Sequence, residues 1–116
     1  MELNSVEQAA MQLLFSREDA LDKNMLSRLS TSSVLEREAT GVGFYCTLKF
    51  AQPLDDMPEL LARDFSFNHP AFRYGGAFHC FFLERDIVEL EAVAFGGRQW
   101  PSDLALTDFA EMIDNN

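Results

Sequence analysis

The sequence AFHCFFLERDIVELEAVAF, residues 77–95, decides the fold of this chain. Two apolar runs rich in phenylalanine and β-branched residues flank the polar tripeptide Glu84-Arg85-Asp86, and the glycine pair Gly96-Gly97 follows the second run. Apolar runs of this length on both sides of a short polar turn predict an antiparallel β-hairpin. We therefore build the rest of the expected fold outward from a hairpin at 77–95.

The register of this hairpin depends on the length of its turn. A two-residue turn at Arg85-Asp86 pairs Phe82 with Glu89, whereas a three-residue turn pairs Phe82 with Val88. We expect the three-residue turn, because two-residue turns require positive φ angles that Arg and Asp adopt poorly. This register gathers on one face Phe78, Cys80, Phe82, Val88, Leu90, Ala92 and Ala94, and on the other face His79, Glu89 and Glu91.

Two further strands are expected upstream of the hairpin. Apolar and polar residues alternate in 44–50, which predicts a strand with one buried face. The segment 34–40 is half charged, which is typical of an edge strand. The glycines of Gly41-Val42-Gly43, between the two strands, permit a tight turn, a bulge or a close backbone approach.

Two helices are expected before the sheet. In both, apolar residues recur at the spacing of one helix face. Ser5 with Gln8 fits a capping box at the start of the first helix. Ser16 with Asp19 repeats this start signal for the second helix, in which we expect a break at Asn24. The apolar faces consist of Val6, Ala9, Ala10, Leu13 and Leu14 in the first helix, and of Ala20, Leu21, Met25, Leu26 and Leu29 in the second.

The remaining segments complete the expected architecture. Asp56 and Pro58 fit the start of a short helix, and a loop is expected at 68–76. A helix is expected at 103–113, with a strand as the alternative because apolar residues alternate at its start. The whole chain, 1–116, is then a single α+β domain whose N-terminal helices pack on an antiparallel sheet of about four strands.

The charge and composition of the chain exclude several classes of function. Its 116 residues carry 19 acidic and 9 basic side chains, a net charge of -10, and 47% of them are hydrophobic. A folded domain with this charge is repelled by phosphate and by anionic lipid, so we expect neither nucleic-acid binding nor membrane binding. Residues 1–20 are unlike a signal peptide, and we expect a cytoplasmic protein in which Cys46 and Cys80 are reduced.

No pattern in the sequence indicates a catalytic centre, a cofactor or a metal site. His79, Glu89 and Glu91 share one face of the expected hairpin, but their spacing matches no ligand motif, and a solvated strand face explains them better. Cys46 lies in mid-strand among apolar neighbours, where a thiol is not activated as a nucleophile. We therefore expect no catalytic, cofactor-binding or metal-binding residues.

The acidic residues gather in three local clusters. Solubility alone is the simpler explanation, because net charge keeps a phenylalanine-rich domain dispersed. The functional explanation is that an acidic surface attracts a basic protein from a distance and speeds its association. On that explanation the clusters bind a partner, with one tryptophan as an aromatic anchor. The predicted partner-binding residues are Glu36, Glu38, Asp55, Asp56, Glu59, Glu89, Glu91 and Trp100.

Two stretches carry a family resemblance, namely Thr40-Gly41-Val42-Gly43-Phe44 and the hairpin from Gly76 through Leu90-Glu91 to Trp100-Pro101. Over about half of the chain they resemble a pattern in small, mostly uncharacterised bacterial proteins of similar length, some of which are similar to immunity proteins of toxin systems. The chain departs from this pattern at the hairpin turn, where Arg85-Asp86 stands in place of Asp-Gly. The resemblance implies a small α+β fold and no catalytic residues.

These observations favour a small, acidic protein-binding module, of the immunity or inhibitor type, whose partner is a basic toxin. The alternative is a small-ligand-binding or enzyme domain with a pocket between sheet and helices, whose polar groups include Tyr45, Tyr74 or His79. A third prediction is a structural homodimer that buries an aromatic face against a second copy. Between these, we expect a protein that is not an enzyme and has no cofactor.

Overall fold

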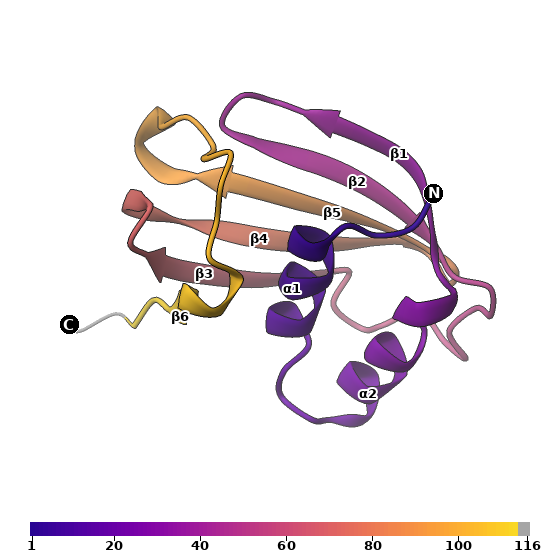
Figure 1. Ribbon diagram of the computed structural model, residues 1–116. Coiled ribbons are helices and arrows are strands. Elements are labelled where there is room, and N and C mark those ends of the chain that lie inside the picture. The colour runs from indigo at the N-terminus through magenta and orange to yellow at the C-terminus, as the bar shows by residue number, and fades with distance from the viewer. Residues whose placement is uncertain (114–116) are drawn as a thin grey trace.

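The computed structural model describes residues 1–113 as an antiparallel sheet with helices on one of its faces (Figure 1). The sheet has six strands in the order β1-β2-β5-β4-β3-β6. The expected α+β class is confirmed, although the sheet is larger than expected. The elements are α1 (Ser5–Leu14), α2 (Ala20–Ser27), β1 (Ser33–Ala39), β2 (Gly43–Lys49), β3 (Ala62–His69), β4 (Phe72–Glu84), β5 (Ile87–Ala94) and β6 (Ala110–Glu111), with 3-10 turns at Leu29–Thr31, Phe95–Gly97 and Leu106–Asp108.

The hairpin of β4 and β5 lies in the middle of the sheet, and its expected register is confirmed. Phe82 pairs with Val88, as the three-residue turn predicted. The turn itself is shorter, because Glu84 pairs with Ile87 across the two residues Arg85-Asp86, and a register shift between Phe82 and Glu84 takes up the extra residue. Neither turn residue has a positive φ angle. A β-bulge therefore replaces the longer turn and leaves the buried face unchanged.

The strands β1 and β2 also follow the expectation. β1 is an edge strand that is exposed at all but one of its seven positions, and β2 pairs with both β1 and β5. The two glycines between them have different roles. Gly41 has a φ of +86° in the turn, and a Cβ atom on Gly43 would collide with the carbonyl oxygen of Ala92. Of the three explanations left open, a tight turn therefore applies at Gly41 and a close backbone approach at Gly43.

Three segments differ from the expectation. The expected loop at 68–76 is instead a tight hairpin between β3 and β4, and Gly75-Gly76 lies inside β4. The helix expected to start at Asp56 and Pro58 is absent, and residues 50–61 form a loop instead. The expected helix at 103–113 is also wrong: a 3-10 turn at Leu106–Asp108 leads into β6, which pairs with β3.

Both expected helices are present, with differences at their starts. The N-cap of α1 is Asn4, whose side chain accepts a hydrogen bond from the Glu7 amide, while the Asn4 amide donates one to the Glu7 carboxylate. The capping box therefore lies one residue before the expected Ser5. The N-cap of α2 is Asp19, and this helix continues through Asn24 without a break. None of the helices in residues 1–113 has the length and apolar character needed to cross a bilayer.

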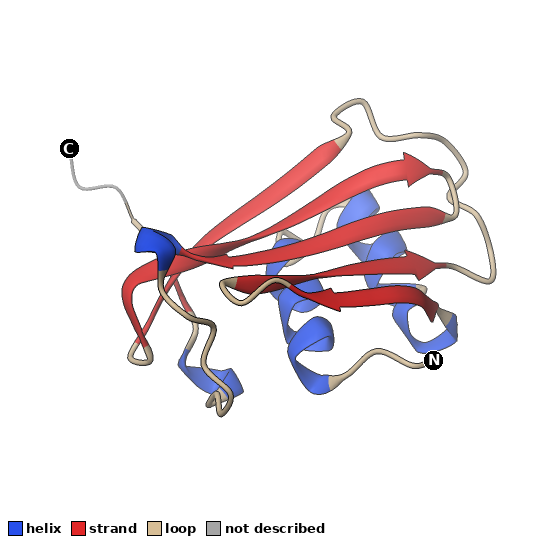
Figure 2. Ribbon diagram, turned by 90° about the horizontal axis from the view of Figure 1, so that it is seen from above, coloured by secondary structure: helices blue, strands red, loops and turns tan. Residues whose placement is uncertain are grey.

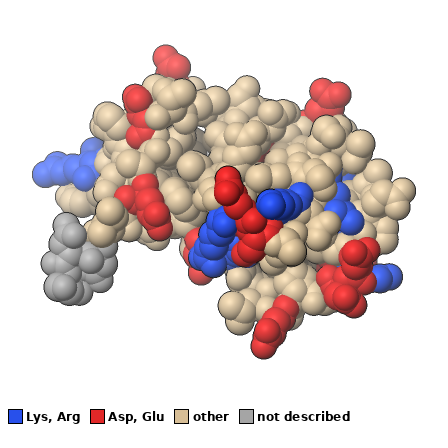
Figure 3. All heavy atoms as spheres, turned by 90° about the horizontal axis from the view of Figure 1, so that it is seen from below, with Lys and Arg blue, Asp and Glu red and all other residues tan. Residues whose placement is uncertain are grey.

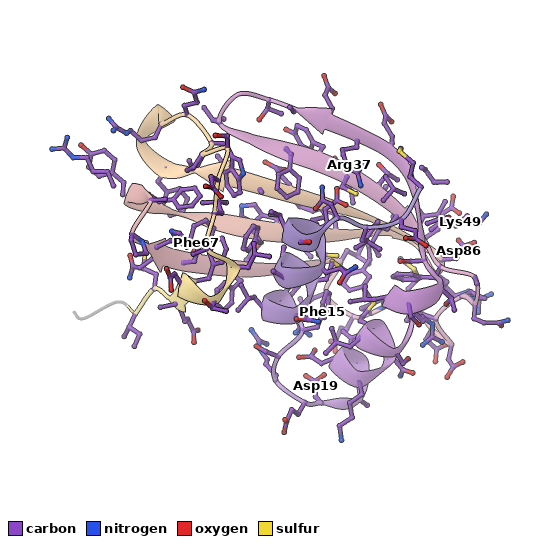
Figure 4. All side chains as sticks on the ribbon, viewed as in Figure 1. Phe15, Asp19, Arg37, Lys49, Phe67 and Asp86 are labelled. Carbon is purple, nitrogen blue, oxygen red and sulfur yellow. The ribbon has the colours of Figure 1, made fainter. Side chains whose placement is uncertain are left out.

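The helices and the segment 95–109 cover the same face of the sheet, and the other face is bare (Figures 1 and 2). The covered face holds the core, in which Phe15 packs edge-on against Phe82. Phe67 lies at the centre of a cluster of aromatic rings at the opposite end (Figure 4), with its ring centroid 4.9 Å from Phe78 and 4.8 Å from Phe109. Because the core lies on one side only, the surfaces left open to a ligand or partner are the bare face and the margins of the helical layer.

Candidate functional site

The bare face of the sheet carries four of the predicted partner-binding glutamates. In β2, Thr47 pairs with a glutamate of β1 on one side and with a glutamate of β5 on the other, and Tyr45 is flanked in the same way. Adjacent strands lie about 4.8 Å apart, so the two glutamates of each row stand about 10 Å from each other. The glutamates are Glu36 and Glu89 beside Thr47, and Glu38 and Glu91 beside Tyr45.

Three of these glutamates, Glu36, Glu38 and Glu89, line a shallow hollow on this face. Its volume is about 320 Å³, and Tyr45 and Thr47 line its floor together with the carboxylates of both neighbouring strands. Lys49 is the single basic residue at the outward-facing positions of the described strands around the hollow, and its Nζ lies 3.7 Å from Asp86 (Figure 4). The hollow is therefore a region of negative potential with an aromatic floor. A cationic side chain fits it in charge and in chemistry.

A histidine, His79, lies on the same face, next to acidic residues of the neighbouring strands. His79 lies beside Glu91 on one side and Asp64 on the other, and its Nδ1 is 2.6 Å from the Asp64 carboxylate. Its ring also stacks on Phe81. The predicted common face of His79, Glu89 and Glu91 is confirmed. Among residues 1–113, however, no group of three or more potential ligands is placed to hold a metal ion.

The other predicted acidic cluster lies elsewhere. Asp55, Asp56 and Glu59 belong to the loop between β2 and β3, where they line an open cleft beside α2. This part of the surface is mixed in charge: the underside of the molecule, on which α2 lies in Figure 1, shows acidic and basic side chains next to each other (Figure 3). The structure thus divides the predicted residues between two surfaces rather than bringing them together.

Trp100, the predicted anchor, lies on the covered side of the sheet. Its ring contacts Phe44 and Phe72 edge-on, with centroids 5.6 and 4.9 Å apart, and its amide donates a hydrogen bond to the carbonyl oxygen of Gly41. It is half-buried and is a member of the cluster around Phe67. Its position explains it as a packing residue that fastens the segment after β5 to the sheet.

Two buried acids, which sequence reasoning did not single out, hold the helices to the sheet. Glu7 of α1 accepts two hydrogen bonds from the guanidinium of Arg37 in β1, each 2.7 Å long. Asp22 of α2 accepts one from Arg63 in β3, also 2.7 Å long, and Arg63 lies over the ring of Phe15. Both carboxylates are almost fully buried. They belong to the fold, because buried charges require partners of this kind.

The pKa of Glu7 reflects these contacts. Burial alone would raise it, but hydrogen bonds from Arg37, from the Asn4 amide and from Cys46 lower it below its ordinary value. The carboxylate is therefore ionised at neutral pH. The same burial, with the neighbouring Glu7 charge, raises the pKa of the Cys46 thiol to about 12, and burial raises that of Cys80 to about 12.

The two cysteines are free, as expected. Both pair with Leu90 from opposite sides, so they lie two strands apart, which places them about 10 Å from each other and beyond the reach of a disulfide. With pKa values this high, neither thiol is a nucleophile at neutral pH. The second histidine, His69, uses both ring nitrogens within the fold, against the Ala105 carbonyl and the Ala71 amide.

The polar groups suggested for a pocket between sheet and helices do not meet in one place. Tyr45 and His79 lie on the bare face, and Tyr74 packs against Gly96 at the end of the sheet. Sequence reasoning also missed Asp64, because β3 was not expected. The alternation of Arg63, Phe65 and Phe67 with polar residues was the signal that would have revealed it.

Comparisons with known proteins give no match from which a function could be assigned. No protein-family model matches the chain, and neither the curated proteins nor the solved structures give a match.

Proposed function

We propose that this protein is a binding module that recognises a basic protein partner through the bare face of its sheet. The observation that carries the proposal is the placement of Glu36, Glu38 and Glu89 around the hollow over Tyr45 and Thr47, with Glu91 next to Tyr45 on the same face. Within residues 1–113 none of these carboxylates forms an ion pair, in contrast with the paired acids of the covered face. Four carboxylates on one solvent-facing surface, with few cations to balance them, fit a surface that attracts a basic partner.

The kind of partner follows from the charge. A surface of this type steers a basic protein toward it and raises the rate of association, and the effect weakens as salt screens it. Basic toxins that act on nucleic acid have the required charge, which supports an immunity or inhibitor role in the cytoplasm. A homodimer through this face is disfavoured by the same argument, because it would bring two acidic surfaces together. The aromatic face is covered by helices and by 95–109.

The proposal is tested by gene context and co-purification. We expect a neighbouring gene that encodes a secreted protein with a basic C-terminal domain, and we expect that domain to co-purify with this protein in low salt but not in high salt. The double variant Glu89→Lys with Glu91→Lys should weaken the complex about tenfold or more in low salt.

A matched control makes the test specific. Asp103→Lys with Asp108→Lys changes the net charge equally, but both residues are exposed in the segment 95–109 on the covered side. We expect this control to bind almost as well as the wild type. Equal losses in both variants, or no loss in the first, would refute the bare face as the binding surface.

A further inference from the structure

A second surface of the molecule has an apolar floor and an acidic rim. It is an open cleft of about 510 Å³ between α2 and the loop 50–61, on the covered side of the sheet. Leu54 and Phe82, at its floor, are buried, and Leu21 of α2 forms part of its wall. The cleft thus gives access from solvent to the apolar interior beside the helical layer.

The rim of this cleft exposes large apolar side chains. Met57 is 39% exposed and Leu60 is 78% exposed, and the next residue, Leu61, is 56% exposed. The loop that carries them is held at both ends: the Leu54 amide donates to the Arg85 carbonyl, and the Leu61 carbonyl accepts from Phe82. Exposed apolar side chains that are grouped beside an apolar cleft mark an interaction surface.

The charges of the cleft decide the chemistry of its occupant. Asp55, Asp56 and Glu59 line the cleft from the loop, and Arg17, just before α2, and Arg63 of β3 line it as well. The charge of Arg63 is neutralised by Asp22, because its guanidinium binds that buried carboxylate. Three carboxylates therefore face one remaining guanidinium, and the cleft has a net negative charge. An anionic amphiphile is disfavoured, whereas an apolar segment with positive charges complements both floor and rim.

We propose that this cleft binds a short amphipathic segment of a partner protein, which places apolar side chains on Leu54, Leu60 and Phe82 and lysines or arginines against Asp55, Asp56 and Glu59. Recognition of this type is that of a helix or peptide in a groove. The cleft and the bare face lie on different sides of the sheet, so this inference does not depend on the function proposed for the bare face.

The test uses a synthetic probe of defined chemistry. A fluorescein-labelled 14-residue peptide carries leucine at positions that share one helix face and lysine elsewhere, and a second peptide has glutamate in place of lysine. Fluorescence anisotropy at physiological salt measures their binding to the full chain. We expect the lysine peptide to bind and the glutamate peptide to bind at least tenfold more weakly.

Variants of the protein locate the bound peptide. Leu60→Ser should weaken binding of the lysine peptide about tenfold, the loss expected for one leucine contact, and Asp56→Asn with Glu59→Gln should weaken it and reduce its salt dependence. Leu83→Ser is the matched control, since Leu83 is 52% exposed and does not line the cleft. All these positions are exposed, so the variants fold.

Three results would overturn the proposal. One is equal binding of the two peptides, and another is a Leu60→Ser variant that binds like the wild type. The third is loss of peptide binding in the Glu89→Lys, Glu91→Lys variant with retention in Leu60→Ser, which would move the peptide to the bare face. Failure of the bare-face proposal alone leaves the Leu60→Ser result unchanged, so the two proposals fail separately.

Discussion

The two faces of the sheet use acidic residues in opposite ways. On the covered face, Glu7 and Asp22 are buried, and each is bound by an arginine of the sheet. On the bare face, the carboxylates beside Tyr45 and Thr47 stand in rows with few cations between them. Position within the fold, rather than residue type, therefore separates the acids that hold the structure from those that are available for a partner.

The difference between the two faces predicts that substitution of Asp22 causes the largest loss of stability. Asp22→Ala removes the partner of Arg63, whose side chain is only 12% exposed, and leaves a buried charge unpaired. We expect a loss of about 3–5 kcal/mol in the free energy of unfolding, measured by urea denaturation. Asp64→Ala, in the same strand but on the bare face, is the control and should cost less than about 1 kcal/mol. Similar losses in the two variants would contradict the division between the faces.

A smaller effect, dependent on pH, is expected at Glu7. Because folding lowers the pKa of this carboxyl below its ordinary value of 4.5, its contribution to stability is present above that pH and is lost as the pH falls through the folded value. At pH 7, Glu7→Gln should lower the free energy of unfolding by about 1.5–3 kcal/mol. The difference from wild type should shrink below pH 4.5 in denaturation curves taken from pH 7 to pH 3.

The control for this pH dependence is Glu89→Gln on the bare face. Its difference from wild type should be small at pH 7, as for a surface substitution. A constant difference between Glu7→Gln and wild type across the whole range would show that the pairing with Arg37 does not depend on the ionised carboxylate.

The smallest effect on stability is expected when the bare face is changed. Glu89→Lys with Glu91→Lys changes two side chains on the bare face of β5, neither of which pairs directly with another carboxylate on a neighbouring strand. We expect the free energy of unfolding to stay within about 0.5 kcal/mol of wild type, as for surface substitutions in general. Thermal and urea denaturation both measure it. A loss of several kcal/mol would mean that these glutamates are structural.

The sequence predicted the centre of the sheet better than its margins. The hairpin at 77–95 and the strand at 44–50 were predicted because one face of each is fully apolar, which leaves a clear period of two. β3 was missed because its alternating pattern has only two large apolar positions, Phe65 and Phe67, and because the pairing with β4 that makes it a strand is not local. Residues 109–111 are extended because Phe109 packs against Phe67, a tertiary contact that overrides local helical signals.

The start of α1 shows how close two local solutions can be. Asn4 with Glu7 and Ser5 with Gln8 are both capping boxes one residue apart, and the sequence alone does not rank them. The chain uses the first, in which Glu7 also binds Arg37, thirty residues away. For the candidate site, alternation placed Glu89, Glu91 and His79 on one face correctly. The alternation did not predict that Asp64 lies on the same face, and it did not show that the acids at 55–59 line a separate cleft.

The central claim is that the bare-face glutamates serve binding and not folding, and one variant tests both halves directly. In Glu36→Gln, Glu38→Gln, Glu89→Gln, Glu91→Gln, the free energy of unfolding and the association rate with the basic partner domain are measured in the same low-salt buffer. We predict unchanged or higher stability and an association rate at least tenfold lower. An unchanged association rate, or a loss of stability comparable to that of Asp22→Ala, would contradict this account.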